Sequence, residues 1–98
     1  MIFKIVIKEE ADSDVIEAYS WYESCQMDLG DEYIAELEDY LQIIEKDPHI
    51  YRIRKSNLRF CPLKRFPYLI VYEIEKKEII VYAVFNTNQN PIKLDRRK

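Results

Sequence analysis

The chain has 98 residues, which is enough for one domain with a single modest core and too few for a second. Its composition is that of a globular protein, because 48% of its residues are hydrophobic and only one glycine and four prolines interrupt it. No stretch comes near the roughly 18 consecutive apolar residues of a membrane span, and residues 1–7 are too short for a signal peptide. We therefore expect one cytoplasmic domain over residues 1–98 that makes no contact with a membrane.

Charge is divided unequally along the chain, although the net charge is only −3. Residues 1–47 hold 14 Asp and Glu against 3 Lys and Arg, whereas residues 48–98 hold 4 against 12. The basic half can therefore attract phosphate groups or an acidic peptide even though the whole chain is anionic. The alternative interpretation is that the two halves attract each other within the fold.

The first half of the chain predicts one strand and two helices. Residues 1–8 form a β-rich run with apolar residues on both faces. Residues 9–27 have a helical period, and the predicted apolar face comprises Ala11, Val15, Ala18, Tyr22 and Cys25. Gly30, the only glycine, is expected at the helix end, with Asp31 available to cap a second helix that Pro48 stops. The inward stripe of the second helix comprises Tyr33, Leu37, Tyr40, Leu41 and Ile44.

The second half predicts a meander of four strands, at residues 50–55, 58–65, 68–75 and 78–85. The third strand is apolar on both faces, with Ile70 and Tyr72 on one and Leu69 and Val71 on the other, so it should be central in the sheet. Residues 86–91 read as a polar loop, and the tail over about residues 87–98 is expected to be mobile.

The order β-α-α-β-β-β-β predicts an α+β fold. Because the connection between the helices is short, the helices should form an antiparallel hairpin on one face of a largely antiparallel, twisted sheet. The N-terminal strand should pair somewhere within that sheet.

Several enzyme classes lack their signatures in this sequence. There is no P-loop, GxGxxG, GxSxG or HExxH motif, and one glycine cannot build a phosphate-binding loop. Cys25 and Cys61 lie far apart without metal-ligand spacing, so neither a disulfide nor a zinc site is predicted. His49 has no catalytic partner that the sequence identifies and is interpreted as structural. We therefore expect no cofactor and no metal.

A set of motifs spread over nearly the whole chain resembles the RelE/ParE toxin superfamily of bacterial type II toxin–antitoxin modules. It looks closest to the ParE-like members, often labelled plasmid stabilisation proteins, whose fold is a helical hairpin on an antiparallel sheet. The order and spacing of the motifs carry the resemblance, which rests on Ala18-x-x-Trp21-Tyr22-Glu23, Leu29-Gly30-x-x-Tyr33, Leu37 and Ile44 before Pro48, Arg59, Phe66-Pro67-Tyr68-x-Ile70-Val71-Tyr72, Ile80-x-Tyr82-Ala83-Val84-Phe85 and Asn90-Pro91.

The RelE-like branch implies a metal-independent, ribosome-dependent endoribonuclease that cuts mRNA by attack of a 2′-OH. Basic side chains would stabilise the pentacoordinate phosphate, and a tyrosine or basic group would handle the proton. The candidates for this site are Arg54, Arg59, Lys64 and Arg65, with Tyr72 or Tyr82 as further members.

The sequence departs from the nuclease pattern at three positions. Leu69 stands where such a nuclease carries arginine, Gln89 stands at a loop position of another arginine, and Leu94 stands at the position of a C-terminal tyrosine. Most of the nuclease set is therefore missing. The loop after the last strand is also neutral here, whereas the family loop is usually rich in histidine or contains arginine.

The ParE-like branch implies a toxin that binds and inhibits DNA gyrase and is neutralised by a cognate antitoxin, whose folding C-terminal segment wraps the toxin. An acidic or amphipathic antitoxin segment would suit the basic half of the chain. The resemblance also allows a homodimer. The candidate partner-binding residues are Arg52, Arg54, Arg59, Lys64, Arg65, Asn86, Asn88, Gln89, Arg96 and Arg97.

Three functions stay open at this stage: a ParE-like toxin, a RelE-like nuclease with an atypical site, and a non-toxic binding protein with the toxin fold. Each basic residue also has a bland interpretation, because arginine and lysine at alternating strand positions commonly form the solvated face of a sheet. Tyr68 and Tyr72 share a face with Ile70 and are interpreted as core residues. Trp21 falls beside the apolar helical stripe and is either an edge of the core or a partner contact.

Overall fold

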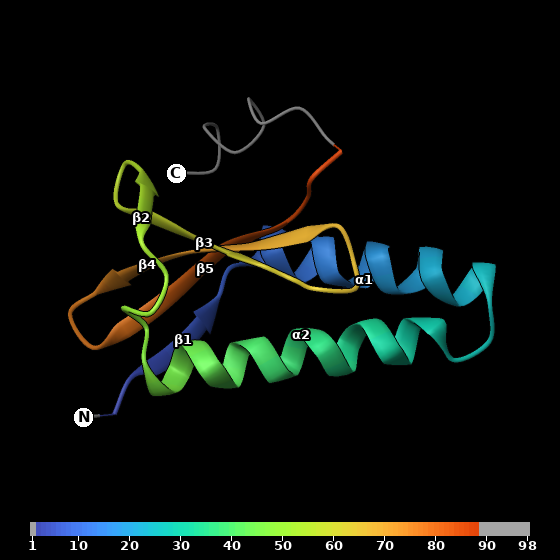
Figure 1. The fold of residues 1–98 in the computed structure, drawn as a ribbon, viewed down its shortest axis with the longest axis horizontal. Coiled ribbons are helices and arrows are strands. Elements are labelled where there is room, and N and C mark those ends of the chain that lie inside the picture. The colour runs from blue at the N-terminus through green and yellow to red at the C-terminus, as the bar shows by residue number, and fades with distance from the viewer. Residues whose placement is uncertain (1, 89–98) are drawn as a thin grey trace.

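Two helices cover one face of a five-stranded sheet in the computed structural model, which describes residues 2–88 (Figure 1). The sheet order is β1-β5-β4-β3-β2. β1 runs parallel to β5, and the other neighbouring strands are antiparallel, so the predicted α+β fold is confirmed. The elements are β1 (Lys4–Ile7), α1 (Glu9–Cys25), α2 (Leu29–Lys46), β2 (Ile53–Lys55), β3 (Leu58–Pro62), β4 (Tyr68–Glu75) and β5 (Glu78–Asn86).

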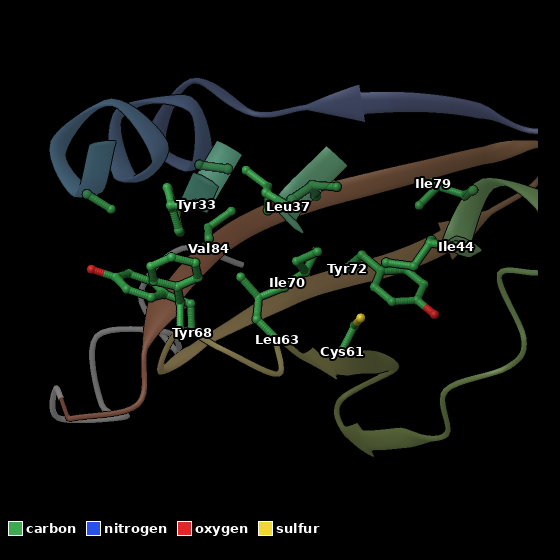
Figure 2. Close-up of a cluster of buried hydrophobic side chains, with 14 residues drawn as sticks. Tyr33, Leu37, Ile44, Cys61, Leu63, Tyr68, Ile70, Tyr72, Ile79 and Val84 are labelled. Carbon is green, nitrogen blue, oxygen red and sulfur yellow. The ribbon is translucent and has the colours of Figure 1, made fainter. Parts of the chain in front are cut away.

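The central strand, β4, has apolar residues on both faces, as the sequence predicts. Ile70 and Tyr72 lie in the main core between the sheet and the helices, whereas Val71 lies in a smaller cluster on the other face with Ala83 and Phe85. Figure 2 shows the main core, where side chains of α2 such as Leu37 and Ile44 lie over the sheet. Burial of this apolar surface is the main favourable term in the stability of the fold.

The helical stripes are mostly confirmed. In α1, Ala11 and Ala18 are buried, and Val15 and Tyr22 pack partly buried against the same cluster. Cys25 is the exception, because it is exposed at the last position of α1, where the helix has already passed the edge of the core. Cys61 is buried, and both cysteines are free thiols.

The prediction for Gly30 is wrong, because this residue lies in the first turn of α2 and not between the helices. Asp28 makes the turn with a left-handed backbone (φ 69°), and the Glu23 carboxylate accepts hydrogen bonds from the backbone N–H groups of Asp28 and Gly30, each at 3.0 Å. Asp31, which was expected to cap α2, also lies inside it. A Cβ on Gly30 would stand 2.8 Å from Cδ1 of Tyr19 and 2.9 Å from its carbonyl oxygen. Glycine is therefore needed for the close approach of the two helices.

Two strands of the predicted meander are shorter than expected. β2 begins at Ile53, and β3 ends at Pro62, so Lys64 and Arg65 belong to the turn before β4 and not to a strand. The Glu36 carboxylate on α2 holds this turn, because it accepts hydrogen bonds from the backbone N–H groups of Lys64 (2.7 Å) and Arg65 (2.9 Å to Oε1 and 3.3 Å to Oε2). No helix in the described part of the chain is long and apolar enough to cross a membrane.

Candidate functional site

The predicted basic residues divide between the two ends of β3. Arg59 lies near its start, opposite Tyr72 of β4, and Ile53 of β2 pairs with it. Lys64 and Arg65 lie beyond its other end, past the pairing of Pro62 with Leu69. Since a strand rises about 3.3 Å per residue, most of the length of β3 separates Arg59 from Arg65. The four nuclease candidates therefore do not converge on one phosphate-sized position.

Arg59 has a structural partner. Its Nη1 donates a hydrogen bond to the Tyr51 carbonyl oxygen at 2.6 Å, and the Tyr72 hydroxyl donates to the Pro48 carbonyl oxygen at 2.7 Å. Both bonds attach the connection between α2 and β2 to the sheet. His49 lies in the same connection, where its ring meets Phe3 edge-on at 6.4 Å between centroids, in agreement with its structural interpretation.

Arg65 joins the basic half of the chain to the acidic half. Its Nη2 forms an ion pair with Glu32 Oε1 at 2.6 Å, and its guanidinium lies over the Phe66 ring at 5.3 Å from the centroid. The predicted attraction between the two halves is thus present at this turn. Because both side chains of the pair are largely exposed to solvent, the pair contributes little to stability.

The candidate tyrosines stay protonated at neutral pH. Burial raises the pKa of Tyr72 to about 12, against a smaller lowering by the Arg59 charge. Burial also raises the pKa of Tyr82, whose hydroxyl donates to Glu73 Oε1 at 3.0 Å. A general base works best with a pKa near the operating pH, so neither tyrosine is adapted to that role. Leu69 lies on the other face of the sheet, where it packs against the small cluster around Val71.

The remaining basic candidates that the structure describes lie at one edge of the sheet. Arg52 and Arg54 are exposed around β2, the last strand of the sheet, and Ile50 and Ile53 beside them are 55% and 51% exposed. Basic and apolar groups thus alternate along an open strand edge. Asn86 lies at the end of β5, and Asn88 lies just after it. The other predicted residues of this region lie outside the described residues: Gln89, Leu94, Arg96 and Arg97. Of the tail predicted at about residues 87–98, the structure describes only positions 87 and 88.

The structure contains a hollow that the sequence analysis did not identify. It has a volume of about 490 Å³ and lies between α1 and the end of β5. Its helical wall carries Asp14, Glu17, Ala18 and Trp21, and its sheet wall carries Tyr68, Val84 and Asn86. The spacing of the helical residues places them on one face of α1. The sequence analysis named Ala18 as part of the apolar face and Trp21 as an edge of the core or a partner contact, but it did not join them in one site, because the sequence does not show that β5 ends opposite this face.

Metal chemistry has no support in the described residues, since no group of three or more His, Cys, Asp or Glu side chains among them could hold an ion. The arrangement as a whole offers surfaces for protein contact: a basic, partly apolar strand edge at β2 and an acidic, aromatic hollow at the end of β5.

Comparison with known proteins places this geometry in a family. A search of curated protein sequences finds no match. Among solved structures, a chain described as "Chromosomal ParDE TA system from P. aeruginosa" has the same fold, with a TM-score of 0.80 and 13% sequence identity, over 89% of this chain and 98% of that chain.

The family model described as "ParE toxin of type II toxin-antitoxin system, parDE" matches residues 5–91, which include every described helix and nearly every strand position. This match runs from inside β1 to beyond β5. The chain therefore belongs to the ParE toxin family of type II toxin–antitoxin systems.

Proposed function

We propose that the protein is a toxin that acts by binding and inhibiting a protein target such as DNA gyrase, and that a cognate antitoxin neutralises it. The family match supports the toxin, and the solved relative described as a ParDE system supports an antitoxin partner. The observation that favours a binding mechanism over RNA cleavage is the placement of the basic candidates. Arg59 is occupied by the Tyr51 carbonyl and Arg65 by Glu32, at opposite ends of β3.

The open edge of β2 is the surface that best suits the antitoxin. An edge strand presents unpaired backbone groups to which an extended peptide can add as a further strand. Arg52 and Arg54 would attract carboxylates of such a peptide, and Ile50 and Ile53 would cover its apolar side chains. An amphipathic, acidic antitoxin segment therefore fits this edge by both charge and hydrophobicity.

The mechanism is tested by producing the protein alone in bacteria, with mapping of mRNA 5′ ends and an assay of DNA supercoiling in the same cultures. We expect growth arrest and loss of supercoiling without new cuts in translated mRNA. Purified protein should also inhibit supercoiling by purified gyrase. New mRNA ends that disappear in Arg65→Gln, which removes from the fold an exposed ion pair with Glu32 and a cation–π contact with Phe66, would instead establish a RelE-like nuclease. Normal growth with neither effect would leave a non-toxic binding protein.

The antitoxin surface is tested separately with charge reversal. Arg52→Glu together with Arg54→Glu should weaken capture of the antitoxin encoded beside the gene at least tenfold and leave the free protein folded. Lys76→Glu together with Lys77→Glu is the matched control, because these two exposed cations lie in the turn between β4 and β5, away from β2. Equal capture by the two variants would contradict this placement.

A further inference from the structure

The strand β5 has an edge that its neighbour β1 covers only in part. β1 pairs with β5 from Glu78 to Val81, after which the chain leaves the sheet and enters α1. Residues 82–86 of β5 continue past this last pairing. The Asp14 carboxylate of α1 takes over part of this edge, because its Oδ2 accepts a hydrogen bond from the Val84 N–H at 3.1 Å.

The hollow described above lies beside this part of the edge, and its walls have a definite chemistry. Glu17 is exposed, and Trp21, one helical turn further along α1, leaves 64% of its surface to solvent. On the opposite wall, Asn86 Nδ2 donates a hydrogen bond to the Tyr68 hydroxyl at 3.3 Å. The hollow thus combines a negative charge, a large exposed aromatic face and oxygen acceptors within about 490 Å³.

This combination selects a particular side chain. A guanidinium group is planar, carries five N–H donors and no acceptor, and stacks on aromatic rings. A cation over the face of an indole is attracted by the ring, and a carboxylate beside it adds a charge-assisted hydrogen bond. Lysine offers a point charge without the stacking plane, and an anionic group would be repelled by Glu17.

We propose that the hollow between α1 and the end of β5 binds an arginine side chain carried by an extended segment of a partner protein. The arginine would stack on Trp21 and pair with Glu17, while the segment runs beside residues 82–86 of β5. The charge of this surface is opposite to that of the β2 edge, and the two surfaces lie on opposite margins of the sheet. The inference stands on the hollow itself and does not depend on the identity of the toxin's target.

The test uses the purified full-length chain and a capped tripeptide, N-acetyl-Gly-Arg-Gly-amide, with the citrulline tripeptide as a neutral probe of the same shape. Trp21 is the only tryptophan, so a single indole N–H signal in a nitrogen-15 NMR spectrum reports on the hollow, and the Val84 amide gives a second signal. We expect the arginine peptide to shift both signals to saturation and to bind at least tenfold more tightly than the citrulline peptide. Equal shifts with the two peptides would overturn the proposal.

The side chains are tested with a matched pair of variants. Glu17→Gln should lower the affinity for the arginine peptide at least threefold, whereas Glu38→Gln, at an exposed position of α2, should leave that affinity unchanged. The chemical change is the same in both variants, and only the place of the lost charge differs: the hollow on α1 in one and the exposed face of α2 in the other. Equal effects of the two variants, or no effect of either, would overturn the proposal.

One further variant distinguishes the partner from the chain's own basic tail. Lys93→Gln, Arg96→Gln, Arg97→Gln and Lys98→Gln together neutralise that tail. With a partner's arginine as the occupant, the indole signal in the absence of peptide and the affinity for the arginine peptide both stay as in the original chain. A shifted indole signal together with tighter peptide binding would make the tail the occupant and overturn the proposal.

Discussion

Two buried tyrosines, Tyr33 and Tyr72, differ in the fate of their hydroxyl groups. The Tyr72 hydroxyl donates a hydrogen bond to the carbonyl oxygen of the buried Pro48 at 2.7 Å, whereas the Tyr33 hydroxyl has no hydrogen-bond partner among the described residues. Both side chains are fully buried, and the Tyr33 ring packs against those of Phe66 and Tyr68, at 5.4 and 5.3 Å between centroids. Replacing each tyrosine by phenylalanine therefore removes a hydroxyl oxygen that is hydrogen-bonded in one case and without a partner in the other.

The magnitudes follow from the cost of an unmade hydrogen bond. Tyr72→Phe leaves the Pro48 carbonyl oxygen without this donor in a buried position, which should lower the free energy of unfolding by about 1 to 3 kcal/mol. Tyr33→Phe removes a desolvated hydroxyl that gains nothing in return, and should raise the free energy of unfolding by about 1 kcal/mol. In a domain of this size, 1 kcal/mol corresponds to a Tm change of roughly 4 to 8 °C.

The assay is urea unfolding followed by circular dichroism, since Trp21 is exposed and would report poorly on the core. The slope of the unfolding free energy against urea should be the same in both variants, so that the midpoint alone carries the comparison. Each variant serves as the control for the other, because the chemical change is identical. A loss of stability in Tyr33→Phe as large as that in Tyr72→Phe would refute the reasoning.

Two further predictions concern the hairpin and the behaviour at high pH. Gly30→Ala should lower the free energy of unfolding by about 1 to 3 kcal/mol in the same assay, because the new Cβ meets the Tyr19 backbone oxygen, which cannot move aside. Alanine is the better helix former, so without this contact the variant would be more stable than the original chain. A more stable variant would therefore contradict the close approach of the two helices. The folded-state pKa of Tyr72, about 12, lies above its ordinary value near 10, so its contribution to stability is complete below pH 10 and is lost as the pH rises towards 12. Urea midpoints at pH 9, 10 and 11 should therefore fall less steeply in Tyr72→Phe than in the original chain, and equal slopes would exclude Tyr72 as a source of the alkaline loss.

The periodicity of apolar residues predicts those helices and strands in which buried side chains recur at regular positions along the chain. The alternation of Ile70 and Tyr72 with Leu69 and Val71 locates the central strand, because a strand covered on both sides must be apolar on both faces. The helical stripe around Tyr33 is recognisable for the same reason. These patterns are local, and each residue's environment repeats with the element's own period.

The position of β1 could not be predicted in the same way. Its four residues carry no signal for their partner, and the parallel pairing with β5 is set by the path of the chain through the two helices. Gly30 was misread because a glycine near a helix end commonly terminates the helix. Its actual cause, the approach of Tyr19 from the other helix, is a tertiary contact.

The candidate sites show the same division between local pattern and tertiary partner. Arg59 and Arg65 could be recognised as a basic group, but their partners, the Tyr51 carbonyl and Glu32, are remote in the sequence or in another element. Glu17 reads as one more solvated carboxylate on a helix until β5 is placed opposite it. Sequence patterns thus identify which residues are available for function, while the assembled sheet determines which of them act together.

The pairing of β1 with β5 has a consequence for synthesis on the ribosome. The first strand of the chain obtains its partner only when residues 78–81 have been made, so nearly the whole domain must leave the ribosome before the sheet can close. Until then, apolar residues of β1 and of α1 lack the surface that covers them in the finished protein. Translation that stops before residue 78 would therefore yield fragments in which β1 has no partner and the sheet cannot close.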